Sequence, residues 1–374
     1  MPNNLNALIP VVITSLRRVL RQTGAVFNAF TVDAQASAAA VGQTVDMPET
    51  RPQSTYDITP AHIPPILTDV TVDKRPLVIE QYKGARFHLT GEDWRAIGAQ
   101  GPDFRGRQID ECIAALIHEA AQYAFGVADA GAGRAIGAAG TAPFATSPNI
   151  LTTGWKILTD YLAPQVGRVG ILSTDEWAGA SNLPQFQKAS EAPAGVQFNT
   201  LGLGTLANFM TSFDQAIGVH ESGTGTGYEV DGATAAGLRT LTLKTGTGTI
   251  LPGDVVHFGT DTDHKYVVES LDTLTLTLRT PLLVAVADDA DVTIAADHRA
   301  NLLCHPDAYA MAIRAPAEAP DGDSADAVQV VSDPVTGLAM RLAHYRGYHA
   351  GQWELSFVYG AAPRRPELAV KLIA

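Results

Sequence analysis

The feature of the sequence that most constrains the fold is one long amphipathic stretch, residues 103–130. A breaker, Pro102, and a candidate N-cap, Asp103, stand at its start. A helix of this length would be roughly 40 Å long and needs an equally long surface to pack on. We therefore expect a rod between two differently built regions. Its apolar residues recur at steps of three and four, on one face of a helix: Ile109, Cys112, Ile113, Leu116, Ile117, Ala120, Ala124 and Val127.

Composition limits the class of protein. The 374 residues are 46% hydrophobic and 17% charged, enough for a sizeable core in two or more subdomains. No apolar run approaches the ~18 residues of a membrane span. The apolar residues 9–16 are followed by arginines, whereas in a signal peptide the basic residues precede the apolar run. We expect a soluble protein that is not exported. The net charge of -13 argues against nucleic-acid binding by phosphate neutralisation, although not against a container for nucleic acid.

The first third of the chain reads as an arm followed by an extended excursion. Residues 1–30 have helical spacing, and their arginines are interpreted as a solvated face, with an acidic partner as the alternative. Residues 34–82 contain strand candidates separated by prolines, which exclude helix and central strands and favour a long hairpin. These strand candidates are residues 41–47, 66–72 and 77–80. Thr90 is a candidate cap for a short helix that leads to the long one.

The middle of the chain predicts an α+β region. Residues 131–140 are rich in glycine and are interpreted as a flexible link. A helix is expected at 149–161, a buried strand at 168–173, and a further helix from Thr174.

Residues 221–294 change character and predict a small antiparallel β-barrel inserted into that region. Turns such as the Leu-Pro-Gly-Asp sequence at 251–254 separate short alternating runs. The runs are residues 240–244, 254–258, 265–269, 273–279 and 291–294. Helical and mixed sequence is expected to resume at 301–314, and strands return from residue 327 to the end.

The search for a catalytic, cofactor or metal site yields none. Cys112 and Cys304 lack disulfide or metal spacing and are expected to be buried thiols. Residues 202–207 loosely match a dinucleotide fingerprint but lack a surrounding βαβ unit and an acidic partner. His118 and Glu119 lack the second histidine of a zinc-protease helix.

Two further groups of polar residues near the C-terminus also lack a site pattern. His344 and His349 have no matching carboxylate motif and are expected to be exposed or locally hydrogen-bonded. Asp321, Asp323 and Asp326 do not have calcium-loop spacing and are interpreted as an acidic turn.

Three stretches nevertheless give the chain a family resemblance. They are the closing segment 357–373 with its Tyr-Gly and Arg-Pro-Glu, the blocks 301–312 and 331–341 after the insert, and the insert itself with LPGDVVHF, KYVVES and TLTLRTPLL. In this order the sequence resembles tailed-phage major capsid proteins of the Hong Kong 97 fold, in the branch of the phage P-twenty-two coat. The resemblance implies an α+β fold with a spine helix at 103–130, peripheral and axial domains, an extended loop and an inserted barrel.

The same resemblance implies a division of the chain. It assigns 1–45 to an N-terminal arm, 46–88 to the extended loop and 89–144 to the peripheral domain. The axial domain takes 145–219 and 299–340, the inserted domain 220–298, and residues 341–374 return to the peripheral domain as strands. Some shells of this fold crosslink a lysine of the extended loop to an asparagine, but no motif here supports transferring that reaction to Lys74 or Lys83.

The implied function is that of a coat protein rather than an enzyme. It would assemble through pentamers and hexamers into an icosahedral head around double-stranded DNA, without sequence-specific binding, cofactor, metal or membrane. Its implied partners are further copies of itself, a scaffolding protein, a portal protein and a decoration protein, and its place is the virion capsid, assembled in the host cytoplasm. Alternatives are another virion protein, a ligand-binding module or enzyme with a barrel insert, and an encapsulin-like shell.

Overall fold

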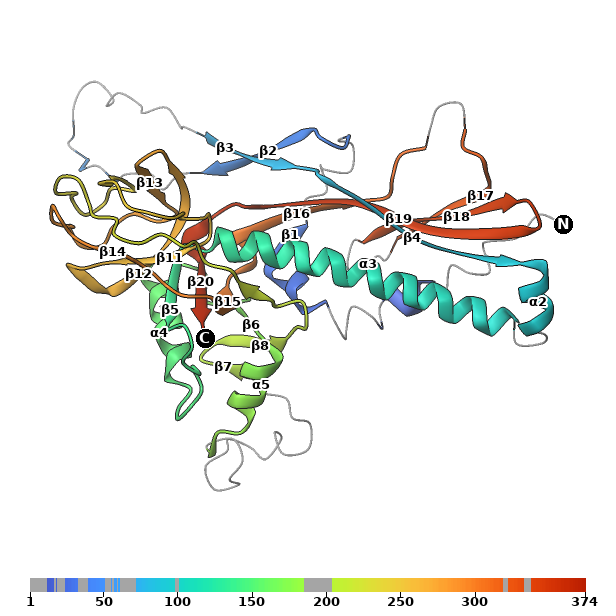
Figure 1. Cartoon of the computed structure of the whole chain (residues 1–374), viewed down its shortest axis with the longest axis horizontal. Helices are drawn as coiled ribbons and strands as arrows, with labels where there is room; N and C mark the ends of the chain where they lie inside the picture. The colour runs from blue at the N-terminus through green and yellow to red at the C-terminus, as the bar shows by residue number, and fades with distance from the viewer. Residues whose placement is uncertain are drawn as a thin grey trace.

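One helix spans most of the molecule in the computed structural model. Helix α3 (Gly101–Gly131) has 31 residues, so the predicted helix is confirmed and begins two residues earlier than expected (Figure 1). Pro102 falls in its first turn, where the missing backbone N–H is tolerated. Of the predicted apolar face, every residue is buried except Val127, which is half-buried. The structure describes residues 12–16, 18, 24–32, 40–50, 55, 57–58, 60, 72–97, 101–184, 204–318, 322–332 and 338–374.

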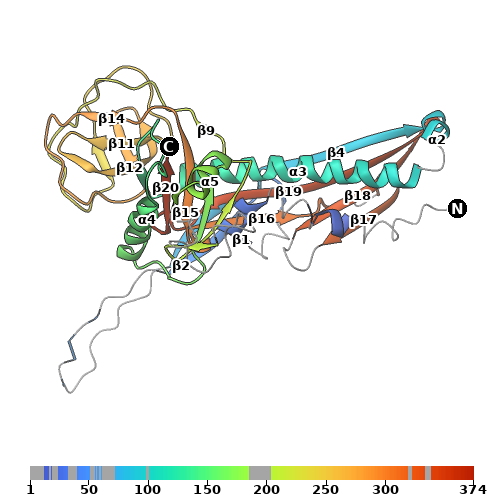
Figure 2. The ribbon, with the colours of Figure 1, turned by 90° about the horizontal axis from the view of Figure 1, so that it is seen from below.

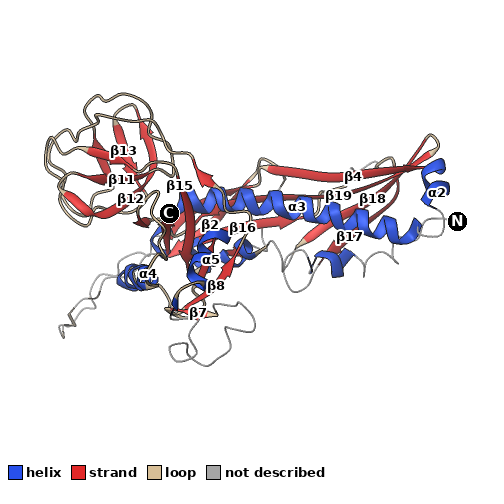
Figure 3. Ribbon diagram, turned by 60° about the horizontal axis from the view of Figure 1, so that its bottom comes forward, coloured by secondary structure: helices blue, strands red, loops and turns tan. Residues whose placement is uncertain are grey.

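Helix α3 packs along a six-stranded sheet (Figure 3). The sheet has the order β1-β16-β19-β18-β17, and β4 (Gln81–Thr90) pairs with the other side of β19. Tyr123 of the helix meets Tyr359 of β19 edge to face at 5.3 Å. The remaining strands are β1 (Phe30–Val32), β16 (Tyr309–Arg314), β17 (Ala325–Ser332), β18 (Ala339–Gly347) and β19 (Ala350–Pro363).

A two-stranded ribbon covers the opposite face of this sheet. Its strands β2 (Thr44–Thr50) and β3 (Val72–Val78) include Pro48 and Pro76, which a ribbon with only edge strands tolerates. Leu77 of the ribbon packs on Ala310 and Val358, whereas their neighbours Tyr309 and Tyr359 pack with α3. The alternation of side chains along each strand therefore separates the two layers. The predicted strand at 66–72 lies outside the described residues except for its last position.

A twelve-stranded sheet crosses the C-terminal end of α3. Its order is β10-β13-β12-β5-β20-β15-β6-β8-β7, with β9, β11 and β14 attached at its sides. Helices α4 (Asn149–Asp160) and α5 (Thr174–Ser181) and strand β6 (Val169–Leu172) confirm the predicted α+β region. The other body strands are β5 (Arg134–Gly137), β7 (Thr205–Leu206), β8 (Phe209–Phe213), β9 (Val219–His220), β15 (His298–Cys304) and β20 (Ala369–Ile373).

Residues 134–137 of the predicted flexible link at 131–140 instead form a strand of this sheet. Strand β5 lies between β12 and β20 and is largely buried. A Cβ on Gly133 would lie 2.4 Å from the carbonyl oxygen of Pro366, so this glycine permits close packing of two backbones. The expected helical character of 301–314 is also wrong. Those residues form the end of β15, a single 3-10 turn at Pro306–Ala308, and β16.

The insert contains all the strands predicted for it. They are antiparallel and enclose their own apolar core, with Val256 and Phe258 among the fully buried residues. Strand β12 also pairs with β5 of the body, so the insert's sheet continues into the body's sheet. The strands are β10 (Thr240–Thr242), β11 (Val255–Phe258), β12 (Asp261–Asp272), β13 (Thr275–Leu278) and β14 (Val292–Ile294).

The two ends of the long molecule differ. The insert lies at one end, and α2 (Gly91–Ile97) lies at the other with the β18–β19 hairpin (Figure 2). The predicted cap of α2 is confirmed, because Thr90 Oγ1 accepts a hydrogen bond from the Asp93 N–H at 3.2 Å. Near the N-terminus, residues 12–16 and 18 are helical. Arg18 pairs there with Asp110 of α3 at 2.6 Å, so this arginine contacts its own chain.

Candidate functional site: the junction of the insert and the long helix

A cluster of buried charged residues lies where the insert meets the C-terminal end of α3. Asp129 comes from the last turn of α3, His220 from β9, Asp254 from the turn before β11, and Lys371 from β20. Their side chains are between 0% and 11% exposed. The cluster therefore joins the long helix, the insert and the C-terminal strand at one buried point.

His220 stands at the centre of this cluster. Its Nδ1 atom lies 2.7 Å from Asp129 Oδ2, and its Nε2 atom lies 3.0 Å from Asp254 Oδ1. Because a carboxylate only accepts hydrogen bonds, two carboxylate partners favour the imidazolium form, in which both ring nitrogens donate. Asp254 also accepts from the backbone N–H of Leu251 at 2.7 Å, which fixes the turn that presents it.

Lys371 completes the cluster. Its Nζ atom lies 2.6 Å from Asp129 Oδ1 and donates to the Gly253 carbonyl at 2.9 Å. With His220 protonated, two cations face two carboxylates, so the buried cluster is formally neutral. A formally neutral cluster of paired charges is the arrangement in which buried charge is tolerated.

The protonation of these groups follows from their surroundings. Burial alone would lower the pKa of His220, but the hydrogen bonds to Asp129 and Asp254 outweigh it, and the pKa is raised. Burial would raise the pKa of Asp129, but His220 and Lys371 lower it. Burial lowers the pKa of Lys371 in spite of its carboxylate partners. His298, whose ring centroid lies 5.1 Å from that of His220, has a pKa lowered by burial and acts as a neutral neighbour.

The insert also caps the end of α3. Arg279 Nε donates to the Ala130 carbonyl at 3.0 Å, and Thr280 Oγ1 donates to the Gly133 carbonyl at 2.8 Å. The last carbonyls of a helix lack intrahelical partners and carry partial negative charge. Arg279 of the insert thus supplies a cation to the end of α3, and Thr280 binds the segment that follows the helix, so we interpret the junction as a rigid attachment of the insert.

The residues rejected as catalytic or metal sites stay apart from this junction. Gly204 precedes the antiparallel β7–β8 hairpin, not a βαβ unit, and residues 202–203 lie outside the described chain. Glu119, the neighbour of His118, pairs with Lys83 at 2.5 Å. Cys112 and Cys304 are buried free thiols, as predicted. Within the described ranges, no group of three or more His, Cys, Asp or Glu residues could hold a metal ion.

The polar residues near the C-terminus differ partly from expectation. Both histidines were expected to be exposed or locally hydrogen-bonded. His349 is exposed, whereas His344 is only 4% exposed, so the first alternative is wrong for His344. The ring of His344 packs 5.0 Å from Trp353, and its Nδ1 atom is 3.6 Å from Asp326 Oδ2. Asp323 pairs with Arg341, and Asp321 lies outside the described residues. No described helix is long and apolar enough to cross a membrane.

Sequence reasoning missed the junction, although it contained a signal. Lys371 stands alone in the apolar strand sequence AVKLI, and Asp129 stands among small apolar residues at the end of the helix. A lone charge in an otherwise buried pattern indicates a buried partner. The sequence alone does not identify that partner.

Comparison with known proteins supports the fold. No protein-family model and no curated protein matches the sequence. The capsid structure of the Cyanophage P-SCSP1u is similar with a TM-score of 0.52 at 11% identity, over 92% of this chain and 86% of that chain. A chain from Gordonia phage Cozz is similar with a TM-score of 0.49 at 10% identity, over 94% of this chain and 86% of that chain. A chain from Mycobacterium phage Che8 is similar with a TM-score of 0.48 at 13% identity, over 92% of this chain and 89% of that chain. The cyanophage match confirms the expected mixed α+β fold of phage capsid proteins.

Proposed function

We propose that this chain is the major capsid protein of a tailed phage, assembling through pentamers and hexamers into an icosahedral head around double-stranded DNA. The observation that carries the proposal is the capsid fold shared with the cyanophage chain across 92% of this chain. Its role is structural rather than enzymatic, and its place is the virion. The proposal needs no cofactor, metal, membrane or sequence-specific contact with DNA.

The architecture suits a flat, rigid subunit of a protein shell. Helix α3 and the six-stranded sheet form a long rigid body, with the β2–β3 ribbon on its outer face. We assign residues 1–45 to an arm, 46–88 to an extended loop, 89–144 to the peripheral domain and 145–219 to the axial domain. Strands β16 and β17 lie in the sheet along α3, whereas β20 lies in the other sheet. After residue 299 we therefore assign the strands along α3 to the peripheral domain and β20 to the axial domain.

We further propose that the insert, residues 220–298, is a small closed barrel of the kind found in the phage P-twenty-two coat branch. Isolated bridges Glu229↔Asp291 and Val230↔Leu243 link one segment to both outer sides of the insert's sheet, which supports closure. The insert's role would be to support folding and contacts between subunits. Deletion of residues 222–296 is expected to abolish soluble assembly, because it removes Asp254 and leaves Asp129 and Lys371 uncovered; normal assembly of the deleted chain would contradict this role.

The proposed partners are further copies of the chain, a scaffolding protein, a portal protein and a decoration protein. Many modest contacts per subunit sum to a stable shell by multivalency. The net charge of -13 supports a lumen that does not hold packaged DNA tightly.

The first experiment is to express the chain with and without a candidate scaffolding protein and to measure particle size by sedimentation and negative-stain microscopy. Closed shells, or rings of five and six subunits, are the expected result. A small stable monomer under every condition would overturn the proposal and favour a ligand-binding module or an enzyme.

A further inference from the structure

The loop between α4 and β6 exposes two large apolar side chains. Leu162 is 89% exposed and Val166 is 85% exposed, and Met210 of the adjacent strand β8 is 62% exposed. Isolated apolar residues on a surface are ordinary, but a group of them on one rigid feature marks an interaction site.

Hydrogen bonds hold this loop rigid. The N–H of Ala163 donates to the Leu158 carbonyl at 2.9 Å, and that of Leu162 donates to the Thr159 carbonyl at 3.0 Å, which together form a Schellman cap on α4. Inside the loop, the buried Arg168 donates from Nη2 to the Ala163 carbonyl at 2.8 Å and from Nε to the Pro164 carbonyl at 2.9 Å. The exposed side chains are therefore presented in a fixed arrangement, as in a preorganised binding surface.

Leu162 is an unfavourable residue for this position in an isolated subunit. Its φ of 58° lies in the left-handed region, where the cap position favours glycine. The side chain also places most of its apolar surface in water. The cap hydrogen bonds hold this backbone conformation, but the side chain itself stays 89% exposed, which favours a contact outside the subunit.

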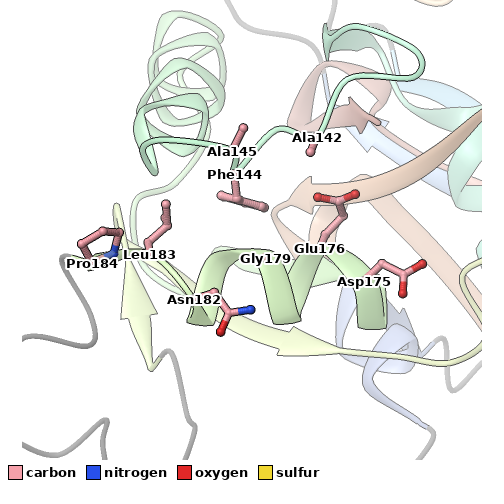
Figure 4. Close-up of a pocket in the computed structure, with 9 residues that line it drawn as sticks. All are labelled: Ala142, Phe144, Ala145, Asp175, Glu176, Gly179, Asn182, Leu183 and Pro184. Carbon is pink, nitrogen blue, oxygen red and sulfur yellow. The ribbon is translucent and has the colours of Figure 1, made fainter.

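A complementary hollow lies at the other end of α4. Figure 4 shows the residues that line a pocket between helix α5 and the loop that leads into α4. The pocket has a volume of about 400 Å³. Its apolar lining includes Ala142, Phe144, Leu183 and Pro184. Of its carboxylates, Asp175 pairs with Arg299 at 2.8 Å, and burial raises the pKa of Glu176. Such a pocket suits an uncharged apolar occupant, and residues 161–167 contain no charged side chain.

We propose that the Leu162–Val166 loop of one copy inserts into the pocket lined by Phe144 and Leu183 of the next copy. The loop follows the last residue of α4 and the pocket wall precedes its first, so about 18 Å of helix separates them. A projection and a hollow at two ends of one helix make a head-to-tail contact that repeats from copy to copy, and in the proposed pentamers and hexamers this repeat closes into a ring. This inference rests on the proposed shell function and assigns a contact within its rings.

Leu162→Gly separates assembly from folding. Glycine relieves the left-handed backbone and removes the projecting side chain, so the melting temperature of the subunit should stay equal or rise while the yield of rings and shells falls at least tenfold. Val330→Ala is the matched control, because Val330 is 52% exposed on β17, away from the insert and the loop, and it should assemble normally. Normal assembly of Leu162→Gly would overturn the inference.

Crosslinking tests the contact directly. Leu162→Cys combined with Ala145→Cys, treated with a short bismaleimide after assembly, should give a ladder of linked chains that ends at five and six. The native Cys112 and Cys304 are buried and give no background. The control pair Val330→Cys with Ala145→Cys should give no ladder. Shells without the expected ladder would overturn this contact and leave the shell function standing, whereas a wild-type chain that never forms shells would overturn both.

Discussion

The Nζ atom of Lys371 lies 2.6 Å from Asp129 Oδ1, and the two side chains are 1% and 8% exposed. The pair joins the C-terminal strand to the last turn of the long helix. Because His220 connects the same carboxylate to Asp254 of the insert, the orientation of the insert depends on buried charges contributed by the body.

Removing Lys371 should therefore be costly. Lys371→Met leaves Asp129 buried with His220 as its remaining cation, and breaking a buried pair typically costs about 3–5 kcal/mol. Urea unfolding of the soluble subunit measures the loss. Lys83→Met removes an exposed pair with Glu119 and should change stability far less. Equal stability of Lys371→Met and the wild type would show that the cluster does not hold the junction.

The junction should also weaken as the pH rises. The pKa of His220 is raised in the folded chain, so its contribution to stability is complete below the ordinary histidine pKa of 6.5 and is lost as the pH rises through the folded value. The lowered pKa of Asp129 acts in the opposite direction, and its contribution is lost only as the pH falls below 3.8 and through the folded value.

The variant His220→Gln isolates this effect. It keeps a polar group but cannot become charged, so its stability deficit relative to the wild type should be largest near pH 6 and shrink at higher pH. Thermal unfolding across that pH range provides the measurement. His349→Gln, on the exposed turn between β18 and β19, serves as control. A deficit that is constant with pH would mean that His220 is not charged in the folded chain.

Local periodicity was sufficient to predict much of this fold. The steps of three and four in α3 and the alternation in the insert are repeated many times within one element, so the signal accumulates. The helical expectation for 301–314 is wrong because strands β15 and β16 are buried at nearly every position and so lack the alternation of half-buried strands. The junction could not be predicted, because its partners come from four separate segments.

The glycines at 131–140 show the same limit. In sequence they indicate flexibility, whereas in the structure Gly133 allows the backbone near Pro366 to approach closely. Gly133→Ala would place a Cβ 2.4 Å from the Pro366 oxygen and 2.6 Å from Thr280 Cγ2, and we expect a loss of about 1–3 kcal/mol or more.

Gly140→Ala is the matched comparison for that substitution. Gly140 has a φ of 72°, but a Cβ added there would have no neighbouring atom within 4 Å, so the cost should be limited to backbone strain of about 1 kcal/mol. Slow amide exchange at β5 would support the ordered strand independently. Fast exchange at residues 134–137 would instead restore the interpretation of this stretch as a flexible link.

The last prediction concerns covalent chemistry between subunits. Lys74 pairs with Asp46 at 3.2 Å and is 71% exposed, and Lys83 pairs with Glu119 at 2.5 Å and is 41% exposed. A lysine nucleophile is usually activated by desolvation or by a neighbouring cation, and neither condition holds for a solvated amine beside a carboxylate. Mature shells should therefore separate into single chains on denaturing gels, and Lys74→Ala and Lys83→Ala shells should give the same pattern. A ladder of linked subunits that disappears in either variant would show that the lysine forms a crosslink after all.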